Sequence, residues 1–172
     1  MDQESLRAAI ERAEHAFARR PGLAKQDKLT VATVREGTLC EVAEDAWKFV
    51  VDMPETQGGT AKGPTPGAYV RTGLAACLAI GYSSRAALLG VPIRSVRVEL
   101  RSDMDLRDIF CGMATVPPYN GITYIVTVES DAPEADIQRV LDESDERSPY
   151  LHVFRSPQNL RRETRVVRSE TV

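Results

Sequence analysis

Apolar residues recur along this chain with the spacing of a helix in some segments and of a strand in others. The first helical pattern is carried by residues three or four positions apart, namely Leu6, Ile10, Ala13 and Phe17. This spacing predicts an amphipathic helix from about Gln3 to Arg19, which Pro21 and Gly22 would end. We expect this helix to pack on the body of the protein or on a second subunit.

Six short segments have the pattern of strands. They are residues 29–34, 39–42, 47–51, 95–101, 122–129 and 160–167. The first three are rich in apolar and β-branched residues, with Glu36-Gly37 as a turn between the first two, and they predict an antiparallel meander. In the next two, apolar residues mostly alternate with polar ones, which predicts strands covered on one face. The last segment is expected to be a closing strand.

A long apolar helix is predicted in the middle of the chain. Residues 63–77 read Gly-Pro-Thr-Pro-Gly-Ala-Tyr-Val-Arg-Thr-Gly-Leu-Ala-Ala-Cys. Thr65 can accept from a free backbone N–H as the N-cap, and Pro66 suits the first helical position. The pattern continues toward Leu89, and few polar side chains interrupt it, so both sides of the helix should be covered by protein. Cys77 then lies three turns inside a buried helix.

The order of these elements predicts an α+β fold in which an antiparallel sheet wraps around one long buried helix. A shorter helix is expected late in the chain, capped by Asp131 with Pro133 in its first turn. A length of 172 residues fits one domain. We divide the chain into an N-terminal helical extension over residues 1–22 and a single α+β domain over residues 23–172.

Charge and composition narrow the class of partner. The chain has 22 Lys and Arg against 25 Asp and Glu, a net charge of −3, so it lacks the basic footprint of a nucleic-acid-binding protein. Its first residues are acidic, and no apolar run approaches the ~18 residues that a membrane span needs. These features predict a cytoplasmic protein that binds small molecules or a second copy of itself, with no nucleic acid and no membrane.

The three cysteines, Cys40, Cys77 and Cys111, are odd in number and far apart in sequence. They form no Cys-x-x-Cys pair and no Cys/His cluster, so neither a disulfide framework nor a zinc site is indicated. His15 and His152 are isolated in the same way. We therefore expect reduced thiols, no metal and no cofactor.

The long helix resembles the signature of the OsmC/Ohr family, the osmotically inducible and organic hydroperoxide resistance proteins. That signature is Gly-x-Asn-Pro-Glu followed by an apolar run that ends in Ala-Ala-Cys. The residues in register with it are Gly63, Pro66, Ala75, Ala76 and Cys77. The order of the later strands and of the Ser148-Pro149-Tyr150 segment also follows the family, so the resemblance extends over roughly residues 28–167.

This resemblance implies an intertwined homodimer with its site at the subunit boundary, near Cys77. It also implies a thiol-dependent peroxidase that acts on organic hydroperoxides in oxidative or osmotic stress. Peroxide-reducing members use a peroxidatic Cys on this helix, a resolving Cys beside a later Pro, an Arg from the N-terminal half and, in the hydroperoxide-resistance branch, a Glu after the Pro that starts the helix. In this chain the resolving position is Ser148 and the Glu position is Gly67.

Cys77 also has a simpler interpretation, since a buried free Cys without a nearby cation is an inert small hydrophobe. The field of the helix dipole fades within the first turn and does not reach it. Activation therefore requires a cation from elsewhere. The resemblance implies an Arg from the N-terminal meander, and Arg35, in its first turn, is the candidate; otherwise Arg35 is a solvated turn residue. Arg71 is the alternative cation, although its spacing from Cys77 favours an interface role.

Because a hydroxyl forms no disulfide, Ser148 cannot resolve an oxidised Cys77. Turnover then needs an external thiol reductant or another internal Cys. Cys111 is the candidate resolving residue, in a loop over residues 108–120 that is long enough to be functional. The simpler interpretation is a loop Cys that has no role, because a disulfide requires Cα atoms within ~7 Å and the sequence does not show that distance.

Two functions remain open from the sequence. The first is an OsmC-like peroxidase with Cys77 as nucleophile, Arg35 as thiolate partner and an external reductant. The second is a catalytically lapsed member of the family that binds an apolar or electrophilic small molecule in the same pocket at the dimer interface. The absence of Glu at position 67 and of Cys at position 148 keeps the second hypothesis open.

Overall fold

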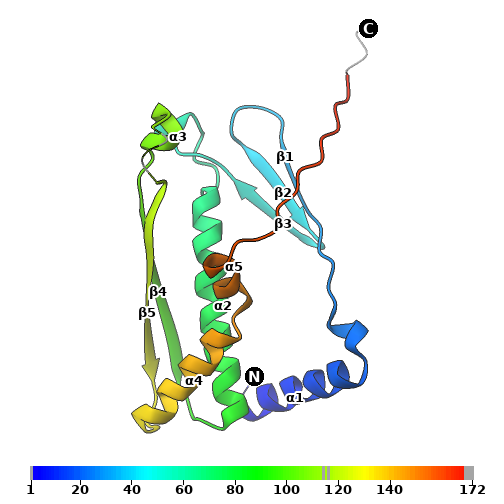
Figure 1. Ribbon diagram of the computed structural model, residues 1–172, viewed down its shortest axis with the longest axis vertical. Coiled ribbons are helices and arrows are strands. Elements are labelled where there is room, and N and C mark those ends of the chain that lie inside the picture. Colours follow the sequence, from blue (N-terminus) through cyan, green and yellow to red (C-terminus); the bar gives the residue numbers. More distant parts are fainter. Residues whose placement is uncertain (1, 114, 116, 169–172) are drawn as a thin grey trace.

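The computed structural model describes residues 2–113, 115 and 117–168, and its elements are arranged along one long helix (Figure 1). In chain order the elements are α1 (Gln3–Arg19), a 3-10 turn (Pro21–Ala24), β1 (Thr30–Val34), β2 (Cys40–Glu44), β3 (Trp47–Val51), a second 3-10 turn (Glu55–Gln57), α2 (Pro66–Leu89), β4 (Ser95–Met104), α3 (Arg107–Cys111), β5 (Tyr119–Glu129), α4 (Glu134–Glu146) and α5 (Pro149–Arg155). The predicted α+β class is confirmed.

Helix α2 begins and ends where the sequence predicts. The side chain of Thr65 accepts a hydrogen bond from the backbone N–H of Ala68 at 3.3 Å, and Pro66 occupies the first helical position. Gly90 ends the helix with a φ of 68°, in the left-handed region that a residue without Cβ adopts at low cost. The predicted α1 is confirmed in the same way, with Asp2 as its N-cap.

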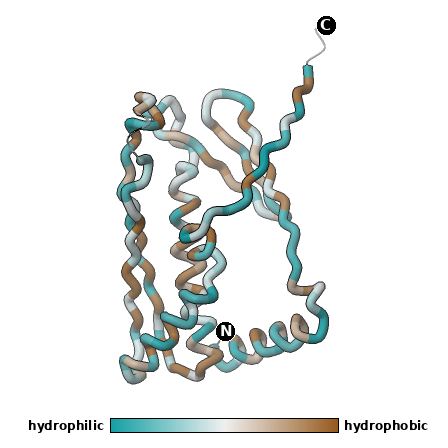
Figure 2. Tube along the Cα trace, in the orientation of Figure 1, coloured by the Kyte–Doolittle hydropathy of each residue, from teal (hydrophilic) through white to brown (hydrophobic). Residues whose placement is uncertain are grey.

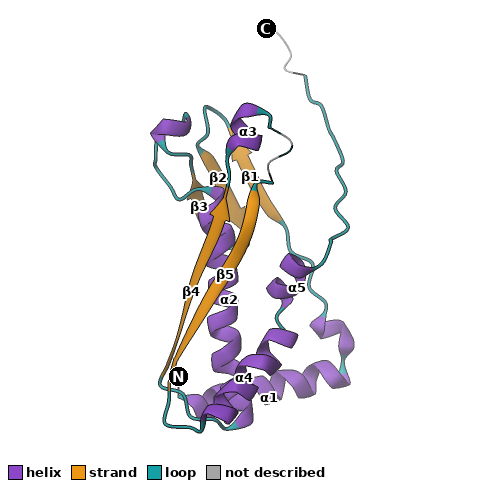
Figure 3. Cartoon of the chain, turned by 60° about the vertical axis from the view of Figure 1, so that its left-hand side comes forward, coloured by secondary structure: helices purple, strands orange, loops and turns teal. Residues whose placement is uncertain are grey.

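The strands form two separate antiparallel sheets rather than a single one. Strands β1, β2 and β3 make a meander, and β4 pairs with β5 in a long ribbon. Figure 3 shows this ribbon running along α2, with α1 and α4 near the C-terminal end of the helix. Residues of high and low hydropathy alternate along both strands of the ribbon (Figure 2), and so does their burial, which lets one face of the ribbon be buried against α2.

The core lies between α2 and the β4–β5 ribbon. Leu74, Leu78 and Tyr82 on one face of α2 are buried there. The strand residues that pack against them are Val96, Val98, Leu100, Ile122, Tyr124 and Val126. Burying a leucine side chain contributes roughly 1.5–3 kcal/mol, so this single face fixes the helix against the ribbon. A second cluster of Ala86, Val91 and Val140 joins α2 to α4.

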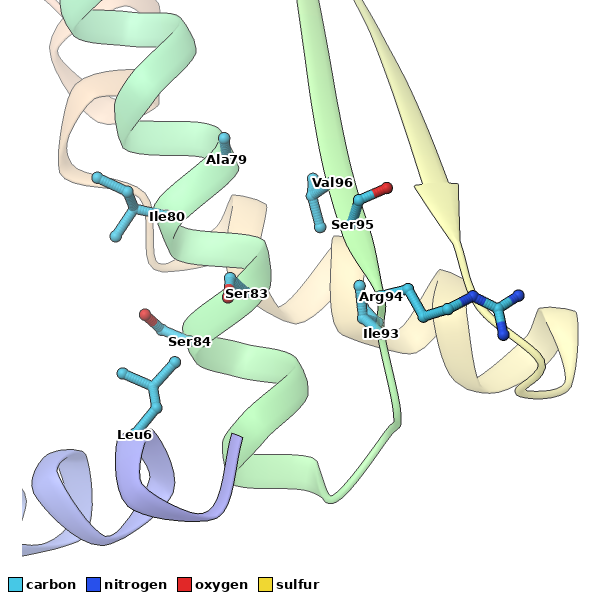
Figure 4. Close-up of a pocket in the computed structure, with 9 residues that line it drawn as sticks. All are labelled: Leu6, Ala79, Ile80, Ser83, Ser84, Ile93, Arg94, Ser95 and Val96. Atoms are coloured by element: carbon cyan, nitrogen blue, oxygen red, sulfur yellow. The ribbon is translucent and has the colours of Figure 1, made fainter. Parts of the chain in front are cut away.

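The opposite face of α2 is open, so the prediction of a helix covered on both sides is wrong for the single chain. Ile80 on this face is 67% exposed. Ile80 projects on the side of α2 that faces away from β4 (Figure 4). Helix α2 is also long and apolar enough to cross a membrane by length and composition alone, contrary to the expectation from sequence, although core helices pass the same test.

Two further sequence-based expectations are corrected. Residues 160–167 form no strand in the described chain: Leu160 and Val167 are 90% and 91% exposed, and a strand needs a paired neighbour that the segment lacks here. Asp131 does not cap α4, whose N-cap is Pro133 without a side-chain hydrogen bond. Instead the carboxylate of Asp131 accepts from Arg94, at 2.6 Å from its Nη1.

The loop that leads into α2 is organised around the carboxylate of Asp52, which is only 1% exposed. Its oxygens accept from the Thr38 and Thr60 hydroxyls, both at 2.7 Å, and from the backbone N–H groups of Met53, Thr60 and Lys62. Gly59 follows in this loop, where an added Cβ would lie 1.8 Å from the carbonyl oxygen of Met53. A larger residue would therefore push this loop away from β3.

Replacing Asp52 by Asn should lower the free energy of unfolding at neutral pH and should make that free energy less sensitive to acid. The hydrogen bonds from Thr38 and Thr60 hold the pKa of Asp52 well below its usual value. Its contribution is therefore complete above the unfolded pKa of about 4 and is lost as the pH falls toward the folded value. We expect Asp52→Asn to unfold at a lower urea concentration at pH 7 and to lose less stability than the wild type between pH 5 and 3.

Asp27→Asn, at an exposed position of the coil before β1, is the matched control and should follow the wild type. A urea midpoint for Asp52→Asn equal to that of the control would contradict the proposed role of the carboxylate.

Candidate functional site

Cys77 is half-buried on α2, on a face next to the core residues Leu74 and Leu78. Its Sγ atom lies 3.9 Å from the Oγ atom of Ser148. Ser148 is the N-cap of α5, where its hydroxyl accepts from the backbone N–H of Leu151 at 3.3 Å. The thiol therefore faces the corner between α4 and α5, although 71 residues separate the two side chains in sequence.

A carboxylate clamp fixes this corner. Asp145, at the end of α4, accepts from the hydroxyl of Tyr82 on α2 and from that of Tyr124 on β5, both at 2.6 Å. Burial, together with the hydrogen bond to Asp145, raises the pKa of both phenols above their ordinary value, so both remain protonated donors at neutral pH. The clamp ties three elements together only three residues before Ser148.

Cys77 opens into a cavity of about 320 Å³ bounded by α2, the α4–α5 corner and α1. From α2 it is lined by Cys77, Gly81, Ser84, Arg85 and Leu88. The corner contributes Ser144, Arg147, Ser148 and Pro149, and α1 contributes Ile10 and Glu14. A cavity of this size lies near the lower end of the range for small-molecule sites.

The cavity carries charges of both signs. Arg85 and Arg147 each place a guanidinium nitrogen 3.7 Å from the same carboxylate oxygen of Glu143. Glu14 lines the cavity from α1. The Cys77 thiol on α2 therefore faces a small cavity whose wall carries two guanidinium groups and the carboxylate of Glu14. The carboxylate of Glu143 pairs with both guanidinium groups.

Several residues singled out from the sequence lie elsewhere. Arg35 is exposed on the turn after β1 and does not line the Cys77 cavity. Cys111 is exposed at the end of α3, and Cys40 lies in β2; neither lines this cavity. Figure 1 shows α3 and the three-stranded sheet toward the N-terminal end of α2, whereas α1 and α4 meet it at the other end.

Gly67 lies in the first turn of α2, next to the side chain of Arg71. A Cβ added at Gly67 would be 3.1 Å from the Nη1 atom of Arg71. The two residues are one turn apart, so the guanidinium occupies the space beside the position where the resemblance expects a Glu. In the 108–120 segment that carries Cys111, positions 114 and 116 are outside the described residues.

The residues that sequence reasoning missed are Arg85, Arg147, Glu143 and the α1 pair Ile10 and Glu14. One signal for Arg85 was present, because Cys77, Gly81 and Arg85 are four residues apart and therefore share one helical face. The approach of α1 and of the α4–α5 corner to that face depends on tertiary packing and left no comparable signal.

Comparison with known proteins identifies the family of this chain. The family model described as OsmC-like protein matches residues 59–162, which include α2, Cys77 and the α4–α5 corner. The chain belongs to this family. No curated protein matches the chain significantly.

The fold is shared with several solved structures. The OsmC-like protein of Mycoplasma pneumoniae has a TM-score of 0.65 and 18% identity, covering 76% of this chain and 89% of that one. The organic hydroperoxide resistance protein OsmC of Legionella pneumophila has a TM-score of 0.58, 15% identity and coverages of 76% and 90%. The organic hydroperoxide resistance protein OhrB of Bacillus subtilis has a TM-score of 0.51, 20% identity and coverages of 76% and 91%.

The contact between Cys77 and Ser148 predicts that Ser148→Cys will form a disulfide within the chain. The present distance of 3.9 Å between Sγ and Oγ requires only a small movement to reach the ~2 Å of an S–S bond. We expect mild oxidation with diamide to remove two free thiols and two hydrogens from the intact mass of this variant.

The double variant Cys77→Ser, Ser148→Cys is the control and should keep its thiols under the same treatment. If Ser148→Cys retained both thiols while remaining folded, the two side chains would not face each other as described.

Proposed function

We propose that this protein is a thiol-dependent peroxidase that reduces organic hydroperoxides, with Cys77 as its nucleophile. The observation that carries the proposal is the position of the Cys77 thiol, which opens into a small cavity and contacts Ser148 across the α4–α5 corner. Membership of the OsmC-like family and the shared fold with proteins named for hydroperoxide resistance support it.

In the proposed reaction each peroxide oxidises the Cys77 thiol, which two external thiols then reduce. The Cys77 thiolate attacks the distal peroxide oxygen, an S–O bond forms as the O–O bond breaks, and the alkoxide takes a proton to leave as an alcohol. Cys77 is then a sulfenic acid. An external thiol condenses with it to give a mixed disulfide and water, and a second external thiol releases reduced Cys77 together with the disulfide of the reductant.

We infer an external reductant from the residues that lie near Cys77. Ser148 is the residue in contact with the thiol, and its hydroxyl cannot form a disulfide. Cys111, the internal alternative, does not line the cavity. We therefore place resolution outside the chain and keep Cys111 as an alternative that mass measurement can detect.

We further propose that the protein acts as a homodimer and that Arg35 reaches the site from the second copy. Apolar side chains are exposed on the open face of α2 and on the three-stranded sheet, among them Ile80, Val31 and Val34. Arg35 directly follows strand β1 of this sheet and does not line the Cys77 cavity of its own chain. A second copy over these surfaces would bury them, and it could carry its own Arg35 toward Cys77 to stabilise the thiolate.

The remaining expectations are proposed together with the activity. We place the protein in the cytoplasm, in a response to oxidative or osmotic stress. We also retain the division into an N-terminal extension over residues 1–22 and one domain over residues 23–172.

A second function is supported by a specific observation. Gly67 and Ser148 stand where the resemblance expects a Glu and a resolving Cys, and the cavity beside Cys77 is of ligand size. A lapsed enzyme that binds an apolar or electrophilic small molecule would keep the cavity without needing a reactive thiol. The oxidation experiment below separates the two functions.

One equivalent of cumene hydroperoxide should oxidise fully reduced protein at Cys77. We expect the intact mass to gain one oxygen and the free-thiol count to fall by one, and Cys77→Ser should show neither change under the same conditions. Cys111→Ser is the matched control and should behave like the wild type if the reductant is external.

A later loss of water, which leaves the mass two hydrogens below that of the reduced protein and does not occur in Cys111→Ser, would instead identify Cys111 as an internal resolving residue. If the wild-type thiol survives as long as free cysteine does, the peroxidase proposal fails and the binding function takes its place.

The homodimer is tested by a charge on the open face of α2. Wild-type protein should have twice the chain mass of 19.0 kDa in light scattering, and Ile80→Glu should shift it to one chain because a carboxylate would be buried without a partner. Ile125→Glu, on the exposed face of β5, is the matched control and should remain a dimer. A wild-type mass of one chain would refute the proposal.

A further inference from the structure

Arg85 is mostly buried, yet it makes no hydrogen bond within residues 2–113 and 117–168. Its side chain is 20% exposed and lines the Cys77 cavity. Its single ion pair is with Glu143, at 3.7 Å, longer than the ~2.8 Å of a charge-assisted hydrogen bond. A guanidinium has five N–H donors, so Arg85 brings unused donors to the wall of the cavity.

Other arginines of this protein are bound more tightly by carboxylates. Arg94 holds Asp131 through both terminal nitrogens, at 2.6 and 3.1 Å, and Arg107 donates from Nε to Asp105 at 3.0 Å. Those side chains are more exposed than that of Arg85. The loosely paired arginine is thus the one that faces the cavity, where a ligand could complete its hydrogen bonds.

The thiol and Arg85 belong to one stripe of α2 with a space between them. Cys77, Gly81 and Arg85 are spaced by four residues, which places the two functional groups about 12 Å apart along the helix axis at their Cα atoms. Helical side chains tend to lean toward the N-terminus of their helix, which for Arg85 is the direction of Cys77. Gly81 has no side chain to fill the interval, and a Cβ there would already lie 2.9 Å from the Oγ of Ser144.

We propose that Arg85 is an anion-binding, specificity-determining residue of this cavity, and that the protein prefers small hydroperoxides that carry a carboxylate. The carboxylate would bind the free N–H donors of Arg85 while the peroxide group lies at Cys77. This inference rests on the proposed role of Cys77 as the reacting thiol. A cavity of about 320 Å³ limits such a substrate to a short chain between its two ends.

The other charges around the cavity set the strength of the effect. Arg147 adds a second cation, and Glu143 offsets both arginines from behind. Glu14, on the α1 wall, opposes an incoming anion. Because Glu143 is shared at 3.7 Å by two guanidinium groups, it orients them without saturating either.

The test compares two alkylating reagents of nearly equal shape and different charge, iodoacetate and iodoacetamide. Their rates are measured at Cys77 by peptide mass spectrometry, and the ratio of the two rates is the readout. Any change in the ionised fraction of the thiol alters both rates equally and cancels in this ratio. Cys111, which is exposed and does not line the cavity, provides an internal reference in the same sample.

We expect Arg85→Gln to lower the iodoacetate to iodoacetamide ratio at Cys77 about fivefold and to leave the ratio at Cys111 unchanged. Arg85→Lys should retain most of the wild-type ratio, since it keeps the charge. Glu143→Gln should raise the ratio, because it removes the carboxylate that offsets Arg85. Arg97→Gln, which changes an exposed arginine on β4, is the matched control and should leave both ratios as in the wild type.

An unchanged Cys77 ratio in Arg85→Gln, with iodoacetamide still reacting at the wild-type rate, would overturn the inference. So would a Cys77 that reacts with neither reagent in the wild type. If the ratio falls as expected while hydroperoxides leave Cys77 reduced, the anion site stands and the peroxidase proposal alone fails. If both hold, a carboxylate-bearing hydroperoxide should oxidise Cys77 faster than a neutral one, and Arg85→Gln should remove that preference.

Discussion

The packing of one face of α2 against the β4–β5 ribbon is the contact on which the rest of the molecule depends. Leu74, Leu78 and Tyr82 fix both the position and the rotation of the helix. Once that rotation is set, Cys77 must point toward the α4–α5 corner, and Ile80 must point away from the ribbon. The site and the open face of the helix are therefore two results of the same packing.

The sequence predicts the parts of the fold that depend on local chemistry. Thr65 and Pro66 mark the start of α2, the spacing of Leu6 and Ile10 predicts α1, and alternation predicts β4 and β5. The errors concern contacts between elements. The segment 160–167 has the pattern of a strand but, within the described residues, no neighbouring strand to pair with, and Asp131 pairs with Arg94 instead of capping α4. Residue patterns alone do not predict such contacts.

The candidate site was likewise predicted only in part. Cys77 and Ser148 were paired through resemblance to a family, and the structure places their side chains in contact. The wall contributed by α1, and the sharing of Glu143 by Arg85 and Arg147, arise from how separate helices pack. The clamp of Asp145 between Tyr82 and Tyr124 was also invisible in the sequence, because its three members lie 21 and 63 residues apart.

Helix α1 lines the cavity but contributes no buried side chain to the core. Ile10 and Glu14 lie outside residues 59–162, and none of the α1 side chains is buried. Substitutions on this helix can change the size and charge of the cavity while the packing of α2 on its ribbon remains intact. One wall of the cavity is therefore built from a helix that contributes no buried side chain to the core, so the shape of the cavity can change without a change in the core or in the thiol.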